Sequence, residues 1–115
     1  MAQYRAAALR REAEERAIAA PRETRAWEVA RRAAAMLRAR FGAARVVVFG
    51  SLVHPGCFTR WSDVDLAAWG IPPGDTFRAI GAAMDIDPEI EVNLVVVDAC
   101  RSSLRAVIER EGVEV

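Results

Sequence analysis

Two short stretches in the middle of the chain combine residue types that could do chemistry. Gly50 and Ser51 follow directly after an apolar run, and Asp63 comes twelve residues after Ser51. A glycine after a buried strand lets the backbone turn tightly and approach a ligand closely. Free backbone N–H groups beside a serine hydroxyl would then suit a phosphate. Taken alone, a Gly-Ser pair after a strand is more often an ordinary turn.

Asp63 and Asp65 form the second stretch, with Val64 between them. Residues two apart on a strand point to the same face, and carboxylates held close together raise each other's pKa unless a cation lies between them. Mg²⁺ is commonly bound by one or two carboxylates together with substrate phosphates. The pair is therefore either an acidic outer face of an edge strand or a magnesium site. A phosphate-binding turn beside a magnesium site is what nucleotidyl transfer requires.

Helices are predicted over most of the N-terminal third of the chain. Residues 4–19 are rich in Ala, Arg and Glu, which are strong helix formers, but they have few bulky apolar side chains. Pro21 predicts a break or a new helix start, and a second helix is expected over residues 22–41, with Gly42 at its end. The first helix lacks a strong apolar face of its own, so we expect it to pack on a partner or on a second copy.

From residue 45 onward, the pattern changes to short buried strands alternating with helices. Strands are expected over 45–49, 64–69 and 90–97, helices over 76–84 and 101–110, and an edge strand over 113–115. Asp75 is the expected N-cap of the first of these helices, and Gly112 ends the second. This alternation predicts the α/β (α+β) class, with helices packed on a small mixed sheet.

These residues resemble the DNA polymerase β-like nucleotidyltransferase superfamily, in particular its minimal nucleotidyltransferases. In that family a strand ends in Gly-Ser, and about ten residues later comes a DxD followed by Leu, as in "GS" at 50–51 and "SDVDL" at 62–66 here. The resemblance covers about residues 25–112. It implies the polymerase β-like fold, with Gly50 and Ser51 holding a nucleoside triphosphate and with Asp63 and Asp65 ligating Mg²⁺.

The chain departs from the family pattern at two places. The family carries a third carboxylate on a later strand, where this chain has Asn93 in "VNLV". Asn93 can ligate a metal only weakly and cannot act as a base, while Glu91, two residues earlier, has a longer side chain that could reach the site. The family's frequent Arg after the Gly-Ser turn is missing, and His54 stands near that place. His54 and Arg60 are each either phosphate contacts or solvated loop residues.

Composition limits the classes of protein to consider. The 115 residues are 53% hydrophobic with a net charge of zero, and no apolar stretch is long enough to cross a membrane. The early residues also lack a signal-peptide core, so the expected location is cytoplasmic. Residues 1–45 carry eleven Arg against five Glu, whereas residues 46–115 carry five Arg against eleven acids. The basic half is either a solvated helix face or a surface that attracts phosphates or an acidic partner.

Three functions follow as hypotheses. The first is an Mg²⁺-dependent nucleotidyltransferase, moving a nucleoside monophosphate from a triphosphate such as ATP to an acceptor. Its nucleotidyltransferase domain would be residues 22–115, after an N-terminal helical extension over 1–21. Since minimal nucleotidyltransferases often resemble antitoxins, the resemblance implies a HEPN-domain toxin as partner and acceptor. The second is an inactive binding module or antitoxin, because of Asn93. The third is nucleic-acid binding through the Arg-rich helices.

Overall fold

The computed structural model describes residues 2–115, which form one long helix and a small sheet flanked by two shorter helices. The helices are α1 (Ala2–Phe41), α2 (Thr76–Met84) and α3 (Ser102–Glu111). The strands are β1 (Arg45–Phe49), β2 (Val64–Trp69), β3 (Val92–Val96) and β4 (Val113–Glu114). Short 3-10 turns occupy Gly50–Val53, Pro73–Asp75 and Val97–Ala99. This is the mixed α and β class that the sequence predicted.

The sheet has the strand order β3-β2-β1-β4. Strand β1 pairs antiparallel with β2 and with β4, whereas β2 and β3 run parallel. The bounds of β1 and β2 coincide with the predicted strands. Strand β3 is shorter than predicted, because the chain enters a 3-10 turn at Val97 and the residues before Val92 belong to the preceding loop. The sheet is thus small and mixed, as expected.

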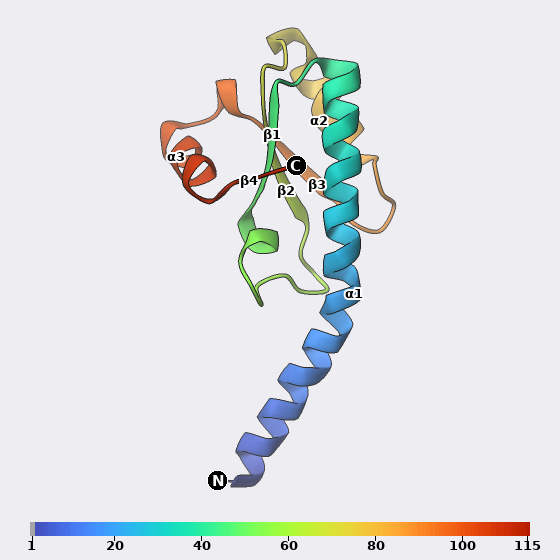
Figure 1. The fold of residues 1–115 in the computed structure, drawn as a ribbon, viewed down its shortest axis with the longest axis vertical. Helices are drawn as coiled ribbons and strands as arrows, with labels where there is room; N and C mark the ends of the chain where they lie inside the picture. The colour runs from blue at the N-terminus through green and yellow to red at the C-terminus, as the bar shows by residue number, and fades with distance from the viewer. Residues whose placement is uncertain (1) are drawn as a thin grey trace.

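Helices cover the two faces of this sheet unequally (Figure 1). On one face, α1 and α2 enclose the larger core, which includes Leu37, Val48, Leu66, Ala79 and Val92. On the other face, α3 closes a smaller cluster of Val47, Ala67, Val97 and Ile108. The β-branched residues of the strands are buried from both sides, which explains why β1 reads as a continuous apolar run.

Helix α1 corrects one prediction, because it is a single helix that continues through Pro21. A proline removes one backbone donor and kinks a helix without necessarily ending it. The helix in Figure 1 changes direction where its blue segment leaves the globular part. The expected boundary between an extension over 1–21 and a domain over 22–115 therefore falls inside α1, while residue 1 lies outside the described residues.

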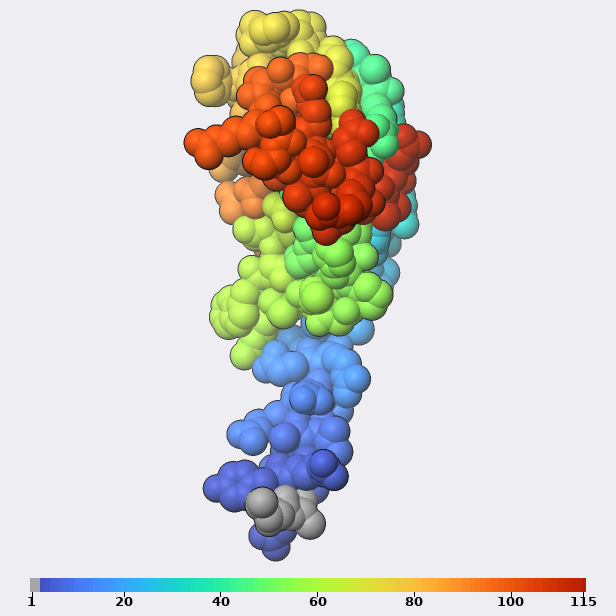
Figure 2. Space-filling view, turned by 90° about the vertical axis from the view of Figure 1, so that its left-hand side faces the viewer, coloured from blue at the N-terminus to red at the C-terminus, as the bar shows by residue number. Residues whose placement is uncertain are grey.

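The N-terminal half of α1 projects away from the rest of the molecule (Figures 1 and 2). The Cα radius of gyration is 16.4 Å and the longest dimension is 58 Å. A compact chain of this size would have a radius of gyration of roughly 13 Å. The described residues include no helix with both the length and the apolar composition needed to cross a membrane.

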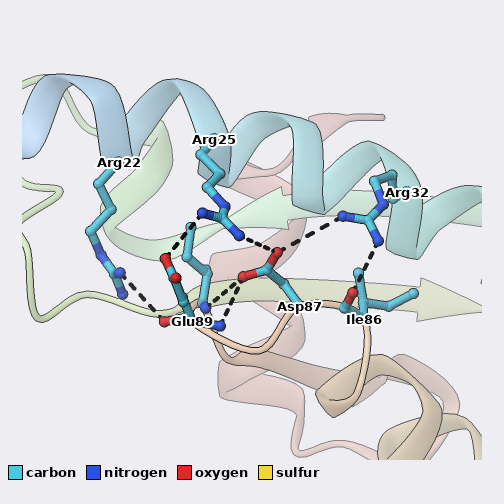
Figure 3. A network of polar contacts seen from close by, with 7 residues as sticks. Arg22, Arg25, Arg32, Ile86, Asp87 and Glu89 are labelled. Carbon is cyan, nitrogen blue, oxygen red and sulfur yellow. Dashed lines mark hydrogen bonds and ion pairs between the residues drawn. The ribbon is translucent and has the colours of Figure 1, made fainter.

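The second half of α1 is tied to the loop that leads into β3 by a polar network around Asp87 (Figure 3). The Asp87 side chain is 3% exposed and accepts a hydrogen bond from Arg25 at 2.9 Å. Its other oxygen accepts the backbone N–H groups of Glu89 and Ile90, both at 2.9 Å. Burial alone would raise the pKa of Asp87, but these hydrogen bonds hold it below its ordinary value. The network therefore fixes the approach to β3.

Asp75 was expected to cap α2, and this prediction is wrong. Its backbone is already in the helical region, and its side chain makes no capping hydrogen bond. The carboxylate instead pairs with Arg78, one turn further along. An N-cap side chain needs an extended backbone to reach the N–H groups of the first turn, and the 3-10 turn over Pro73–Asp75 removes that geometry.

Candidate active site

Asp65 lies at the uncovered end of one face of the sheet. Along β2, Asp65 shares a face with Ala67 because their side chains alternate with those of Val64 and Leu66. Helix α3 covers this face around Ala67 through Ile108. Asp65 itself remains half-buried, near the start of the strand. The sheet thus holds one carboxylate rigidly at a position that a ligand can reach.

The Gly-Ser turn reaches this carboxylate directly. Phe49, the last residue of β1, is the register partner of Asp65, and the chain then turns at Gly50 with φ +76°. A Cβ added to Gly50 would overlap the Asp65 Oδ2 and lie 3.3 Å from its Cγ. Only glycine combines this backbone conformation with this close approach. The structure therefore places Gly50, the first residue of the Gly-Ser turn, against the Asp65 carboxylate.

Asn93 is the neighbour of Asp65 on the other side. The two residues are Cα partners in the parallel pairing of β2 with β3. Burial raises the pKa of the Asp65 carboxyl, a hydrogen bond with Asn93 partly offsets this, and the negative charge of Asp63 raises it further. Asp63 itself lies just before β2 and is partly exposed. The two aspartates and the asparagine thus form one polar cluster beside the Gly-Ser turn.

This cluster suits a magnesium ion in its donor chemistry. Mg²⁺ prefers oxygen ligands and usually keeps several waters, so two carboxylates and an amide carbonyl suffice when substrate phosphates complete the shell. Burial and the negative charge of Asp63 raise the pKa of Asp65, and a bound cation would offset both effects. Asp63 and Asp65 are the residues that would hold the ion, with Asn93 as a neutral third oxygen donor.

Glu91 was expected to be a possible substitute for the third carboxylate. It lies just before β3 and is exposed, and its carbonyl accepts the Val64 N–H at 2.9 Å. Across residues 2–115, no three His, Cys, Asp or Glu side chains gather into a metal-binding group. In the pairing of β2 with β3, Asn93, rather than Glu91, is the Cα partner of Asp65.

His54 and Arg60 each pair with a carboxylate of a helix. The His54 Nε2 lies 3.2 Å from the Glu111 carboxylate at the end of α3. Arg60 lies 3.5 Å from the Glu15 carboxylate of α1, and its guanidinium stacks 5.0 Å from the Trp61 ring centroid. Both belong to the loop between β1 and β2, but the contacts of this structure direct them to two different helices.

Arg22 is a positioning residue that the sequence did not suggest. Its guanidinium donates to the Ser62 carbonyl at 2.9 Å, directly before Asp63, and lies 6.0 Å from the ring of the buried Phe58. Figure 3 shows the same side chain reaching the loop that leads to β3. Arg22 thus joins α1 to both segments that carry the polar cluster. No local signal could have found it, since its partner is 40 residues away.

Comparison with known protein families and with curated proteins finds no match for this chain.

Proposed function

We propose that this chain is an Mg²⁺-dependent nucleotidyltransferase that moves a nucleoside monophosphate, from ATP, to a hydroxyl of a partner protein. One observation carries the proposal: Gly50 sits so close to the Asp65 carboxylate that no other residue fits there. A Gly-Ser turn against the Asp65 carboxylate suits a substrate whose phosphates would be bound by the turn and by a metal ion on that carboxylate. The resemblance to minimal nucleotidyltransferases points to a HEPN-domain toxin as the partner.

The transfer is a displacement at the α-phosphorus of the triphosphate. The acceptor oxygen forms the new bond, the bond from the α-phosphorus to the bridging oxygen breaks, and pyrophosphate leaves. Backbone N–H groups after Gly50 and the Ser51 hydroxyl would bind the β- and γ-phosphates. Bound Mg²⁺ would supply charge neutralisation at the phosphates.

The acceptor proton needs a base, and the amide of Asn93 cannot serve. Asp65 is the carboxylate that lies against Gly50, so it is the candidate proton acceptor. In this proposal, Asp65 combines metal binding with proton acceptance, and Asp63 supplies the second carboxylate.

The second candidate function is a binding module that neutralises a partner without transfer. The observation that favours it is the register of Asp65 with a neutral Asn93, which leaves the cluster one carboxylate short of the family pattern. Both candidates use the same surface, and they differ in whether a phosphorus–oxygen bond forms.

The test is label transfer from [α-³²P]ATP with Mg²⁺ to the product of the neighbouring gene. The matched variants are Asp65→Asn, which removes the charge beside Gly50, and Asp85→Asn, which removes an exposed charge after α2. We expect the wild type and Asp85→Asn to label the acceptor and Asp65→Asn to lose the activity. Absence of label with the wild type, at a partner concentration that gives a stable complex, would favour the binding module instead.

A further inference from the structure

The projecting half of α1 carries a seam of residues at the spacing of a helix–helix contact. Positions three and four apart alternate along it, which is the heptad spacing of two packed helices. Tyr4 is 81% exposed and Ile18 is 47% exposed, although both are large apolar side chains. The seam consists of Tyr4, Ala7, Arg11, Glu14, Ile18 and Pro21.

Self-complementarity of the seam points to its partner. Two copies can pair antiparallel about a two-fold axis between Arg11 and Glu14. Each charged seam residue then faces a seam residue of opposite charge, and each uncharged one faces another uncharged one. A parallel pairing would instead set Arg11 against Arg11 and Glu14 against Glu14, which is repulsive. The antiparallel register pairs Tyr4 with Pro21, Ala7 with Ile18, and Arg11 with Glu14, each of them twice.

A hollow at the base of the projecting segment suits this register. It has a volume of about 280 Å³ and is lined by Ile18, Pro21, Arg22, Arg25, Glu89 and Ile90. The same register delivers the Tyr4 side chain of the second copy to Pro21, at the mouth of this hollow. An aromatic ring over guanidinium groups gains a cation–π attraction in addition to its burial.

We propose that this chain forms an antiparallel homodimer through the seam of α1, with Tyr4 of each copy seated in the hollow of the other. The paired segment is roughly 26 Å long at 1.5 Å per residue, so the two globular parts lie at its opposite ends. Residues 4–21 then gain the tertiary contact that a helix of this length needs in water. This proposal does not depend on the nucleotidyltransferase activity.

Cysteine cross-linking tests both the contact and its direction. In a Cys57→Ser/Cys100→Ser background, which removes the two native thiols, Ala7→Cys and Ile18→Cys are made as separate single variants. Mixing them should give at least roughly tenfold more disulfide-linked dimer than either variant alone, because only the antiparallel register brings the two Cα atoms within bonding range. A mixture of Ala6→Cys and Ala17→Cys, on another face of the helix, is the control and should not cross-link.

Charge reversal tests the register in solution. Arg11→Glu and Glu14→Arg should each weaken the dimer by about tenfold in sedimentation velocity, since each change converts two attractive pairs into repulsive ones. The double reversal restores the pairs and should restore the dimer. A monomer at every concentration, cross-linking of Ala7→Cys with itself, or assembly only with a different protein would overturn the proposal.

Discussion

Gly50→Ala is the substitution that most directly probes the site. Gly50 has φ +76°, and an alanine there pays about 1–2 kcal/mol for the left-handed conformation. Its Cβ would also overlap the Asp65 carboxylate, and forcing an extra methyl into a filled space costs about 1–3 kcal/mol. The displaced carboxylate would no longer face the Gly-Ser turn. We therefore expect both stability and Mg²⁺-dependent nucleotide binding to fall.

Gly56 provides a matched control in the same loop. It has the same φ of +76°, but nothing lies within 4 Å of an added Cβ. Gly56→Ala should therefore lose only the backbone contribution, about 1–2 kcal/mol, and should keep nucleotide binding. The difference between the two variants isolates the contact with Asp65.

The assay combines urea unfolding with calorimetric titration of ATP in the presence of Mg²⁺. A double variant, Gly50→Ala/Asp65→Ala, removes the overlapping carboxylate and should recover the extra loss of stability, in the manner of a double-mutant cycle. Equal losses of stability in Gly50→Ala and Gly56→Ala, within about 0.5 kcal/mol, together with wild-type nucleotide binding by both variants, would refute the contact between Gly50 and Asp65.

Four further substitutions test the charges of the site and of the Asp87 network that supports it. Asn93→Asp should tighten Mg²⁺ binding by roughly tenfold in calorimetry, because it adds a third carboxylate beside Asp65; unchanged binding would mean that Asn93 does not face the ion. Because the folded-state pKa of Asp65 is raised, wild-type stability falls as pH rises through that pKa. Asp65→Asn should therefore raise the melting temperature at pH 7 and lose this gain below about pH 4; an equal gain at both pH values would contradict the pKa argument. Asp87→Ala should cost about 2 kcal/mol in urea unfolding by leaving two backbone N–H groups unpaired. Glu89→Gln, whose side chain is 70% exposed, should cost less than about 0.5 kcal/mol. The stabilisation by Asp87 is fully present above the ordinary aspartate pKa and is lost as pH falls through the lowered folded-state pKa. A loss of this stabilisation that starts near neutral pH would contradict the lowered pKa of Asp87.

The sequence predicted the central strands well, because they are buried and their signals are local. Apolar runs that end at a glycine, Gly50 after β1 and Gly70 after β2, fix where the two strands end. Once these two strands pair, Phe49 falls opposite Asp65, and the meeting of the Gly-Ser turn with the carboxylate follows from the register. This part of the candidate site could therefore be anticipated without a structure.

Features that depend on distant contacts could not be anticipated in this way. Pro21 is a local signal for a break, but favourable helix formers before it and packed residues after it keep α1 continuous. The contacts of His54, Arg60 and Arg22 each join segments far apart in the chain. Their partners are set by how helices pack on the sheet, and nothing in the neighbouring residues encodes that choice.

The continuous α1 also means that one helix spans two regimes of local unfolding. Beyond Pro21, its inner face is fully buried at Ala26, Ala30 and Leu37, so opening those turns requires opening the core. Before Pro21, the isolated chain offers little buried surface, and those turns can fray without disturbing the sheet. Along this single helix, the free energy of the opening that permits amide exchange would therefore rise. It would be small before Pro21 and would approach the global free energy of unfolding beyond it. Any partner that covers the seam would extend global protection toward the N-terminus.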